Sequence, residues 1–117
     1  MTVESPDRGE IWMVCFDPST GDEIKKTRSA VVVSSPTLVR LRLRIIVPIT
    51  GWHPHSSKIP WHYLIKAGAA TGLDKDSVAD ALQIKSMSLD RFLKKIGRVS
   101  ATDLEEIIAA VKMLIDD

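Results

Sequence analysis

The sequence contains one cysteine, Cys15, so the chain has no second thiol for an internal disulfide. A single thiol flanked by an apolar strand is typical of a buried cysteine in a reducing compartment, and we favour this interpretation over a catalytic cysteine. The first ten residues lack the apolar core of a secretory signal. No segment approaches the ~18 consecutive apolar residues of a membrane helix. These absences predict a cytoplasmic protein with no membrane partner.

Several signatures of enzymes and metal sites are also missing. The chain has no GxxxxGKS/T phosphate loop, no HExxH, no paired CxxC and no GxSxG elbow. His53 and His55 form an HPH motif, but no cysteine or carboxylate stands nearby to complete a metal ligand set. We therefore expect neither a bound metal nor another cofactor.

Acidic residues are absent from Ile24 to Leu73, and all 15 of them fall in 1–23 and 74–117. The acid-free stretch contains three His and eight Lys or Arg, namely Lys25, Lys26, Arg28, Arg40, Arg42, Arg44, Lys58 and Lys66. Charge separated along the chain can form a basic surface that attracts a polyanion. In the alternative, acidic and basic residues interleave in space and cancel. We favour the basic surface.

At 117 residues the chain is expected to form one domain, 1–117, with a loose terminus over 1–7. Apolar patterns predict strands at 9–17, 29–35, 39–50 and 61–66, with one or two more strand segments within 74–87. Both faces of the first strand are apolar, so it should lie centrally in a sheet. Since strands come first and helices last, the expected class is an α+β fold or a small barrel.

Two helices are predicted near the end of the chain. Ser88 is the expected N-cap of a short helix over 88–97, which Gly97 ends. Ser100 is the expected N-cap of the final helix. The final helix has an apolar stripe that should face the core, made of Leu104, Ile107, Ile108, Val111, Leu114 and Ile115.

The strand predicted at 39–50 has the clearest alternation in the chain. A period of two places Arg40, Arg42 and Arg44 on one face of it. The intervening residues Leu41, Leu43 and Ile45 fall on the other face. Arginine is suited to forked contact with phosphate, so this face could bind flanking RNA, or it could serve only to keep one sheet face soluble.

Arg28 and Thr50 are residues suited to phosphate chemistry, one entering a strand from a long loop and the other ending a strand. RNA carries its own nucleophile, the 2′-hydroxyl, next to each phosphate. A protein therefore needs only to position the strand, move a proton and stabilise charge on phosphorus. Metal-dependent nucleases need grouped carboxylates, so cleavage here would proceed without metal. Glu23 and His53 are the nearby candidates for proton transfer.

Three motifs resemble the MazF/PemK (Kid) family of toxin endoribonucleases. The segment RGEIWMVCFDPSTGDEIKKTR resembles the family's opening strand, its D-P-x-x-G-x-E loop and the closing arginine. VPIT matches the family's V-P-x-T, and LQIKSMSLDRFLKKIG resembles its Q-x-R-T-x-D-x-x-R-L segment. The likeness runs from Arg8 to Ile115 with the motifs in order.

The resemblance implies an SH3-like β-barrel of five to seven strands, with a short helix and a C-terminal helix, acting as a homodimer. It implies a metal-independent endoribonuclease that cuts single-stranded messenger RNA, leaves a 2′,3′-cyclic phosphate, and is neutralised by a cognate antitoxin in the RNA groove. The catalytic pair carries over to Arg28 and Thr50. The expected RNA-binding residues are Glu23, Lys25, Lys26, Trp52, His53, Gln83 and Lys85.

The chain departs from the family at several positions. Ser29 follows the loop arginine where the family usually has proline, and Ile24 replaces a common glutamine. In the Kid-like branch a carboxylate precedes the glutamine and helps proton transfer, whereas this chain has Leu82 there and Asp80 two residues earlier. Two alternatives therefore stand beside the nuclease: an RNA-binding relative without cleavage, and, less favoured, a toxin acting on a protein such as gyrase.

Overall fold

The computed structural model describes residues 5–116. Its seven strands are β1 (Glu10–Cys15), β2 (Thr27–Val32), β3 (Leu43–Gly51), β4 (His62–Ile65), β5 (Ser77–Asp80), β6 (Lys85–Ser88) and β7 (Phe92–Arg98). One α-helix, α1 (Ala101–Ile115), follows them. Four short 3-10 turns lie between strands, namely η1 (Pro36–Leu38), η2 (Pro54–Lys58), η3 (Ala81–Gln83) and η4 (Leu89–Arg91).

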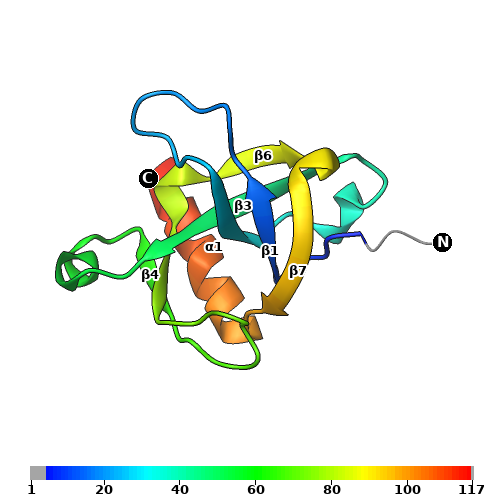
Figure 1. Ribbon diagram of the computed structural model, residues 1–117. Coiled ribbons are helices and arrows are strands. Elements are labelled where there is room, and N and C mark those ends of the chain that lie inside the picture. The colour runs from blue at the N-terminus through cyan, green and yellow to red at the C-terminus, as the bar shows by residue number, and fades with distance from the viewer. Residues whose placement is uncertain (1–4, 117) are drawn as a thin grey trace.

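All seven strands belong to one antiparallel sheet, in the order β4-β5-β3-β2-β1-β7, with β6 paired to β3. The α+β class and the seven strands confirm the expected fold. The sheet curves but does not close into a barrel, because β4 and β7 remain at its two ends (Figure 1). One side of β3 changes partner along its length, from β6 up to Ile46 to β5 from Ile49. Pro48, which has no N–H, lies at this change of partner.

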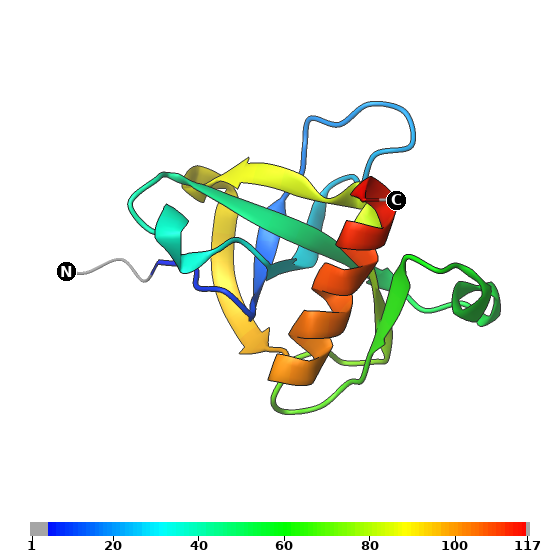
Figure 2. The ribbon, with the colours of Figure 1, turned by 180° about the vertical axis from the view of Figure 1, so that it is seen from behind.

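The sheet buries apolar side chains on both faces. Helix α1 lies across one face, as Figure 2 shows, and we call this the helix face. Its core includes Ile11, Val31 and Val47, all fully buried. The other face, here called the site face, buries Val14 and Ile46 among a second apolar cluster. The prediction of a central first strand with two apolar faces is therefore confirmed.

The predicted burial of Cys15 is wrong. Its side chain is only partly buried, because β1 ends at this residue and the chain passes into the loop over 16–26. Of the terminus predicted to be loose, residues 1–4 lie outside the described residues. Residues 5–7 make contacts: the Asp7 N–H donates to Glu10 Oε1 at 2.8 Å, and the Pro6 carbonyl accepts from Arg44.

The helix predicted over 88–97 is also wrong. Ser88 caps only the single turn of η4, where its hydroxyl accepts from the Asp90 N–H, and the chain then extends as β7. A ten-residue helix is marginal by itself, whereas β7 satisfies the backbone groups along one side of β1. Lys95 Nζ in β7 also lies 2.8 Å from the buried Glu10 carboxylate. Burial would raise the pKa of Glu10, but hydrogen bonds led by the one from Lys95 lower it overall.

The predicted arginine face does not exist, since β3 begins only at Leu43. Arg40 and Arg42 therefore lie in the preceding turn, and Leu43 is 47% exposed. Arg44 is inside the protein, 3% exposed, and donates to backbone carbonyls. Polar and apolar residues do alternate across Leu43 and Arg44, but Leu43 faces solvent and Arg44 faces inward. Arg44 can be buried because main-chain carbonyl oxygens accept hydrogen bonds from its guanidinium.

The final helix begins as predicted, with the Ser100 hydroxyl accepting from the Asp103 N–H at 3.0 Å. Ile107 is fully buried, and Leu104, Ile108 and Val111 pack against the core. The stripe faces the core only in part, because Ile115 at the end of the helix is 77% exposed. No helix in residues 5–116 is long and apolar enough to cross a membrane.

Candidate functional site

Arg28 and Thr50 meet at the place where two neighbouring strands separate. Pairing of β2 with β3 ends at Ala30 opposite Pro48. Continuing the same register by two residues sets Arg28 opposite Thr50. Both residues line one pocket of about 250 Å³. The tertiary structure thus brings together the two residues that the sequence nominated.

Each of the two residues is held by a strand neighbour on its other side. Arg28 pairs with Val14 of β1, and Thr50 pairs with Val78 of β5. Cross-strand partners point to the same face, so both side chains belong to the site face. Arg28 is exposed, and within residues 5–116 its guanidinium has no carboxylate partner. It is therefore available to pair with a phosphate.

The lining of this pocket contains no acidic side chain. Besides Arg28 and Thr50 it is made of Met13, Thr27, Ser29, Ile49, Gly51, Lys75 and Ser77. Lys75 was not predicted from the sequence, because the negative charges of its neighbours Asp74 and Asp76 offset its positive charge. In the structure Asp76 turns to the Ala67 N–H and to Lys66, at 2.8 and 3.8 Å. The pocket therefore presents positive charge and hydroxyl groups.

The loop over 16–26 extends beyond the sheet, at the top of Figure 1. Asp17 closes its base, since Asp17 Oδ1 accepts from the Lys26 N–H at 2.8 Å. Lys26 adopts a left-handed conformation with φ of 65°. Glu23 folds back on the loop, where its Oε1 accepts from the Thr20 N–H at 2.6 Å. The exposed carboxylate of Glu23 therefore orders its own loop in this structure.

Gln83 fastens this loop to the sheet. Its Nε2 donates to the Asp22 carbonyl at 3.1 Å, and its Oε1 accepts from the Ile24 N–H at 3.4 Å. These bonds bracket Glu23 in the chain. Gln83 was nominated as an RNA contact, and the structure gives it a second role as a clamp on the loop.

The remaining nominated residues are more dispersed. Lys25 and Lys26 are exposed on the same loop as Glu23. Trp52 is 44% exposed just past the end of β3, and the His53 ring stacks on His55 with centroids 5.4 Å apart. Lys85 lies in β6 opposite Ile46. Four of the nominated residues thus belong to the loop before Arg28 or contact it, two more lie in the loop after Thr50, and Lys85 lies opposite a residue farther along β3.

The acid-free stretch of sequence does not stay separate from acidic residues in space. Arg42 pairs with Asp90 at 2.5 Å, and Lys66 pairs with Asp76. Arg44 is buried. Lys25, Lys26, Arg28, Arg40 and Lys58 have no ion pair in the described part of the chain. Three of these five residues lie in or beside the loop that leads to the site, whereas Arg40 lies in the turn before β3 and Lys58 ends η2.

One titratable pair escaped the sequence analysis because its members are distant in the chain. His62 of β4 faces Asp80 of β5, with Nε2 3.7 Å from Oδ2 and both side chains largely buried. The pair shares the site face with Thr50, roughly 10 Å away across two strand spacings. At that distance His62 cannot contact a phosphate bound at Thr50 directly.

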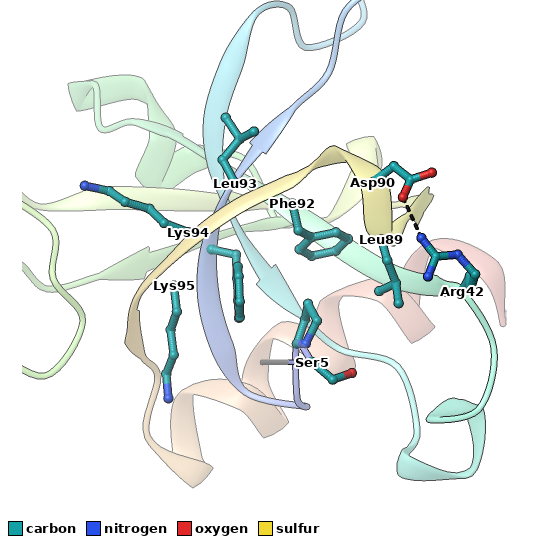
Figure 3. Close-up of a pocket in the computed structure, with 10 residues that line it drawn as sticks. Ser5, Arg42, Leu89, Asp90, Phe92, Leu93, Lys94 and Lys95 are labelled. Carbon is teal, nitrogen blue, oxygen red and sulfur yellow. Dashed lines mark hydrogen bonds and ion pairs between the residues drawn. The ribbon is translucent and has the colours of Figure 1, made fainter. Parts of the chain in front are cut away.

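A larger hollow of about 710 Å³ opens elsewhere, beside β7 (Figure 3). Phe92 and Leu89 point into it, whereas Lys94 points away, and Arg42 with Asp90 forms an ion pair at its rim. Neither Arg28, Thr50 nor any of the expected RNA-binding residues lines it. Residues 5–116 contain no group of three or more His, Cys, Asp or Glu side chains placed to hold a metal ion.

Comparison with known proteins places these features in a family. The family model described as "PemK-like, MazF-like toxin of type II toxin-antitoxin system" matches residues 7–115. The chain is 41% identical over 116 residues to endoribonuclease MazF9 of Mycobacterium tuberculosis, with 93% of this chain and 95% of that protein covered. It is 28% identical to endoribonuclease PemK of Escherichia coli, with 93% and 81% covered.

Solved structures share the fold. MazF of Deinococcus radiodurans superposes with a TM-score of 0.83 at 21% identity, covering 98% of this chain and 100% of that one. A mycobacterial endoribonuclease solved in complex with its cognate antitoxin superposes with a TM-score of 0.72 at 17% identity, covering 93% of each chain. The similarity thus extends over nearly the whole length of both sequence and structure.

Proposed function

Because this chain belongs to the family of PemK-like, MazF-like toxins of type II toxin–antitoxin systems, we propose that it is an endoribonuclease that cleaves single-stranded RNA without a metal ion. The observation that supports this proposal is the shared pocket of Arg28 and Thr50, whose lining contains no acidic residue. The relatives named above are described as endoribonucleases.

The reaction requires that the 2′-hydroxyl of one nucleotide attack its own 3′-phosphate. The new O–P bond forms as the bond to the 5′-oxygen of the next nucleotide breaks, which leaves a 2′,3′-cyclic phosphate and a 5′-hydroxyl. One proton leaves the 2′-oxygen and one reaches the 5′-oxygen. Arg28 stabilises the negative charge that gathers on the phosphate oxygens, and the Thr50 hydroxyl donates to one of them.

Proton transfer has two candidates, as the sequence indicated. Glu23 lies in the loop next to Arg28, and RNA binding would have to release its carboxylate from the Thr20 N–H. His53 lies in the loop after Thr50 and is exposed. Nucleophile activation by a side chain typically contributes 10²–10⁴-fold to the rate, so the two can be separated by substitution.

We further propose that the protein acts as a homodimer in the cytoplasm, where messenger RNA is available, and that a cognate antitoxin neutralises it. A solved relative from a mycobacterial species is described as bound to its cognate antitoxin, which supports this partner. The RNA contacts proposed around the catalytic pair are Glu23, Lys25, Lys26, Trp52, His53, Gln83 and Lys85.

The test is to incubate a long single-stranded RNA with the protein in EDTA and to map the ends of the fragments. The wild type should cut at short preferred sequences, and Arg28→Ala should lose at least about 100-fold in rate, the loss typical of removing one charge-stabilising donor. Arg40→Ala is the matched control, since Arg40 is exposed and lies outside the pocket. Cleavage that survives in Arg28→Ala, or that requires Mg²⁺, contradicts the mechanism.

The second candidate function is RNA binding without cleavage. Leu82 stands where the Kid-like branch has a carboxylate, and its side chain is 58% exposed with no proton to exchange. This alternative predicts RNA affinity that falls steeply with salt and no fragments from the wild-type protein. The mapping experiment in EDTA therefore separates the two functions.

A further inference from the structure

The loop over 16–26 is attached to the sheet at Ile24. The Ile24 side chain packs against the apolar cluster of the site face. Its N–H donates to Gln83 Oε1 at 3.4 Å, and Gln83 Nε2 donates to the Asp22 carbonyl at 3.1 Å. Glu23, a candidate for proton transfer, lies between these two bonded residues. Whatever orients Gln83 therefore also orients the part of the loop that carries Glu23.

Gln83 is the last residue of η3, a turn of only three residues. The turn is closed where the Ile84 N–H donates to the Ala81 carbonyl at 3.3 Å. Short 3-10 turns make few internal hydrogen bonds, and the geometry of those bonds is poor. The orientation of η3, and with it that of the Gln83 side chain, therefore depends on groups outside the turn.

Asp80 provides one of these groups at the start of the turn. It is the last residue of β5 and the N-cap of η3, where its Oδ1 accepts from the Leu82 N–H at 3.1 Å. The Ala81 N–H donates to the Trp61 carbonyl at 3.1 Å. Such a cap satisfies an N–H that the first turn of a helix leaves free. Asp80 thus ties the direction of η3 to strand β5.

The Asp80 carboxylate is itself held by the neighbouring strand. Asp80 lies opposite His62 of β4, and its Oδ2 is 3.7 Å from His62 Nε2. The Asp80 and His62 side chains are only 15% and 16% exposed. His62 Nδ1 is buried without a hydrogen-bond partner among residues 5–116, so the ring turns its other nitrogen to a polar group. One carboxylate oxygen therefore faces the imidazole, which leaves the other for the Leu82 N–H.

We propose that Asp80 is a positioning residue for RNA cleavage, which holds the loop over 16–26 in place through η3 and Gln83. This inference rests on the proposed function and assigns to it a residue that lies outside the pocket of Arg28 and Thr50. Leu82 transmits the contact through its N–H, while its side chain is 58% exposed. The effect of Asp80 on cleavage must therefore pass through Gln83.

Hydrogen exchange at the Ile24 N–H, measured without RNA, tests whether Asp80 holds the loop. Asp80→Ala should accelerate this exchange about fivefold, the effect typical of losing one N-cap. Asp80→Asn keeps a capping oxygen and should restore most of the protection, because asparagine caps as well as aspartate does. Ser35→Ala is the matched control and should leave exchange at Ile24 unchanged, since it removes the equivalent cap of η1, where the Ser35 hydroxyl accepts from the Thr37 N–H at 3.2 Å.

Cleavage of a short single-stranded RNA then separates positioning from general stability. The value of kcat/KM should fall about fivefold in Asp80→Ala and recover in Asp80→Asn. In the Gln83→Ala background the clamp on the loop is already absent, so Asp80→Ala should lower kcat/KM little further. If Asp80 stabilises only the sheet, Asp80→Ala lowers kcat/KM by the same factor in both backgrounds, and this additive result would overturn the inference.

Failure of the proposed function gives a different pattern. If the wild type produces no fragments, the nuclease proposal fails, but the exchange measurement needs no RNA and still tests whether Asp80 holds the loop. RNA affinity from fluorescence anisotropy then replaces kcat/KM in the comparison of the two backgrounds. Equal exchange at Ile24 in the wild type and in Asp80→Ala overturns the inference in either case. Thermal unfolding verifies that each variant is folded. If Asp80→Ala is unfolded, Asp80→Glu replaces it, because glutamate keeps the charge but is not among the residues that cap well.

Discussion

Replacing Arg44 should destabilise the protein more than replacing any other arginine of the RLRLR segment. Arg44 is 3% exposed, although an arginine normally keeps its charged end in water. No carboxylate pairs with it in the described part of the chain. The guanidinium is solvated instead by main-chain carbonyls from two separate segments, and it joins the start of the chain to the turn before β3.

The size of the effect follows from the hydrogen bonds. Arg44 donates to the carbonyls of Pro6, Leu41 and Leu43 at 2.9, 2.8 and 2.9 Å. Two longer bonds, of 3.3 and 3.2 Å, go to the carbonyls of Leu38 and Val39, and a bond of 2.7 Å goes to the Ser5 hydroxyl. At about 1 kcal/mol net for each of the three short bonds to main-chain carbonyls, Arg44→Met should lose about 3 kcal/mol of unfolding free energy. For a chain of this size that is a fall in Tm of about 12 °C.

Urea unfolding followed by tryptophan fluorescence measures this loss. The midpoint should fall while the m-value stays constant. Arg42→Met is the matched control: its side chain is 70% exposed and pairs only with the 77% exposed Asp90, so the change should stay within about 0.5 kcal/mol. If Arg44→Met does not fold, Arg44→Lys replaces it in the test. Lysine keeps the charge but has fewer hydrogen-bond donors, so the loss of unfolding free energy should be intermediate. An unfolding free energy of Arg44→Met within about 0.5 kcal/mol of wild type would refute the reasoning.

Two further predictions concern the sheet and its loop. Tyr63 is the only tyrosine; burial, and then its hydrogen bond to Asp103, raise its pKa from 10.0 to about 12. The contribution of Tyr63 to the unfolding free energy is therefore complete below about pH 10 and is lost as the pH rises from 10 towards 12. Tyrosinate absorbance measures the titration of Tyr63, and a midpoint at 10 would contradict this prediction. Gln83→Ala removes the acceptor of the Ile24 N–H, so hydrogen exchange at Ile24 should accelerate about fivefold. Exchange at Glu23, whose N–H donates to the Thr20 carbonyl, is the internal control, and an unchanged rate at Ile24 would show that the clamp does not hold the loop.

Local patterns in the sequence were sufficient for much of the fold. Alternation located β1 and β4, and the Ser100 cap located the start of α1, because period and capping act over a few neighbouring residues. The same rules were wrong for 88–97. There the Ser88 cap forms only the single turn of η4, and the residues that follow form β7 because they pair with β1.

The candidate site divides in the same way. Sequence motifs nominated Arg28, Thr50 and Gln83, and the family resemblance behind them is confirmed by the match over residues 7–115. Lys75 was not found, since Asp74 and Asp76 offset its charge in the sequence, whereas in the structure Asp76 accepts from the Ala67 N–H and lies near Lys66. The His62–Asp80 pair was not found either, because it is formed only by the register between β4 and β5.

The sequence by itself determined which side chains are suited to bind phosphate, where the turns lie and which segments form strands. These properties depend on short-range sterics, on capping and on the two-residue period of a strand. Only the tertiary structure decided that Arg28 lies opposite Thr50 and that His62 faces Asp80. Only it decided that Arg44 is buried among carbonyls. Each of these outcomes depends on strand register and backbone groups far away in the chain, which no local pattern encodes.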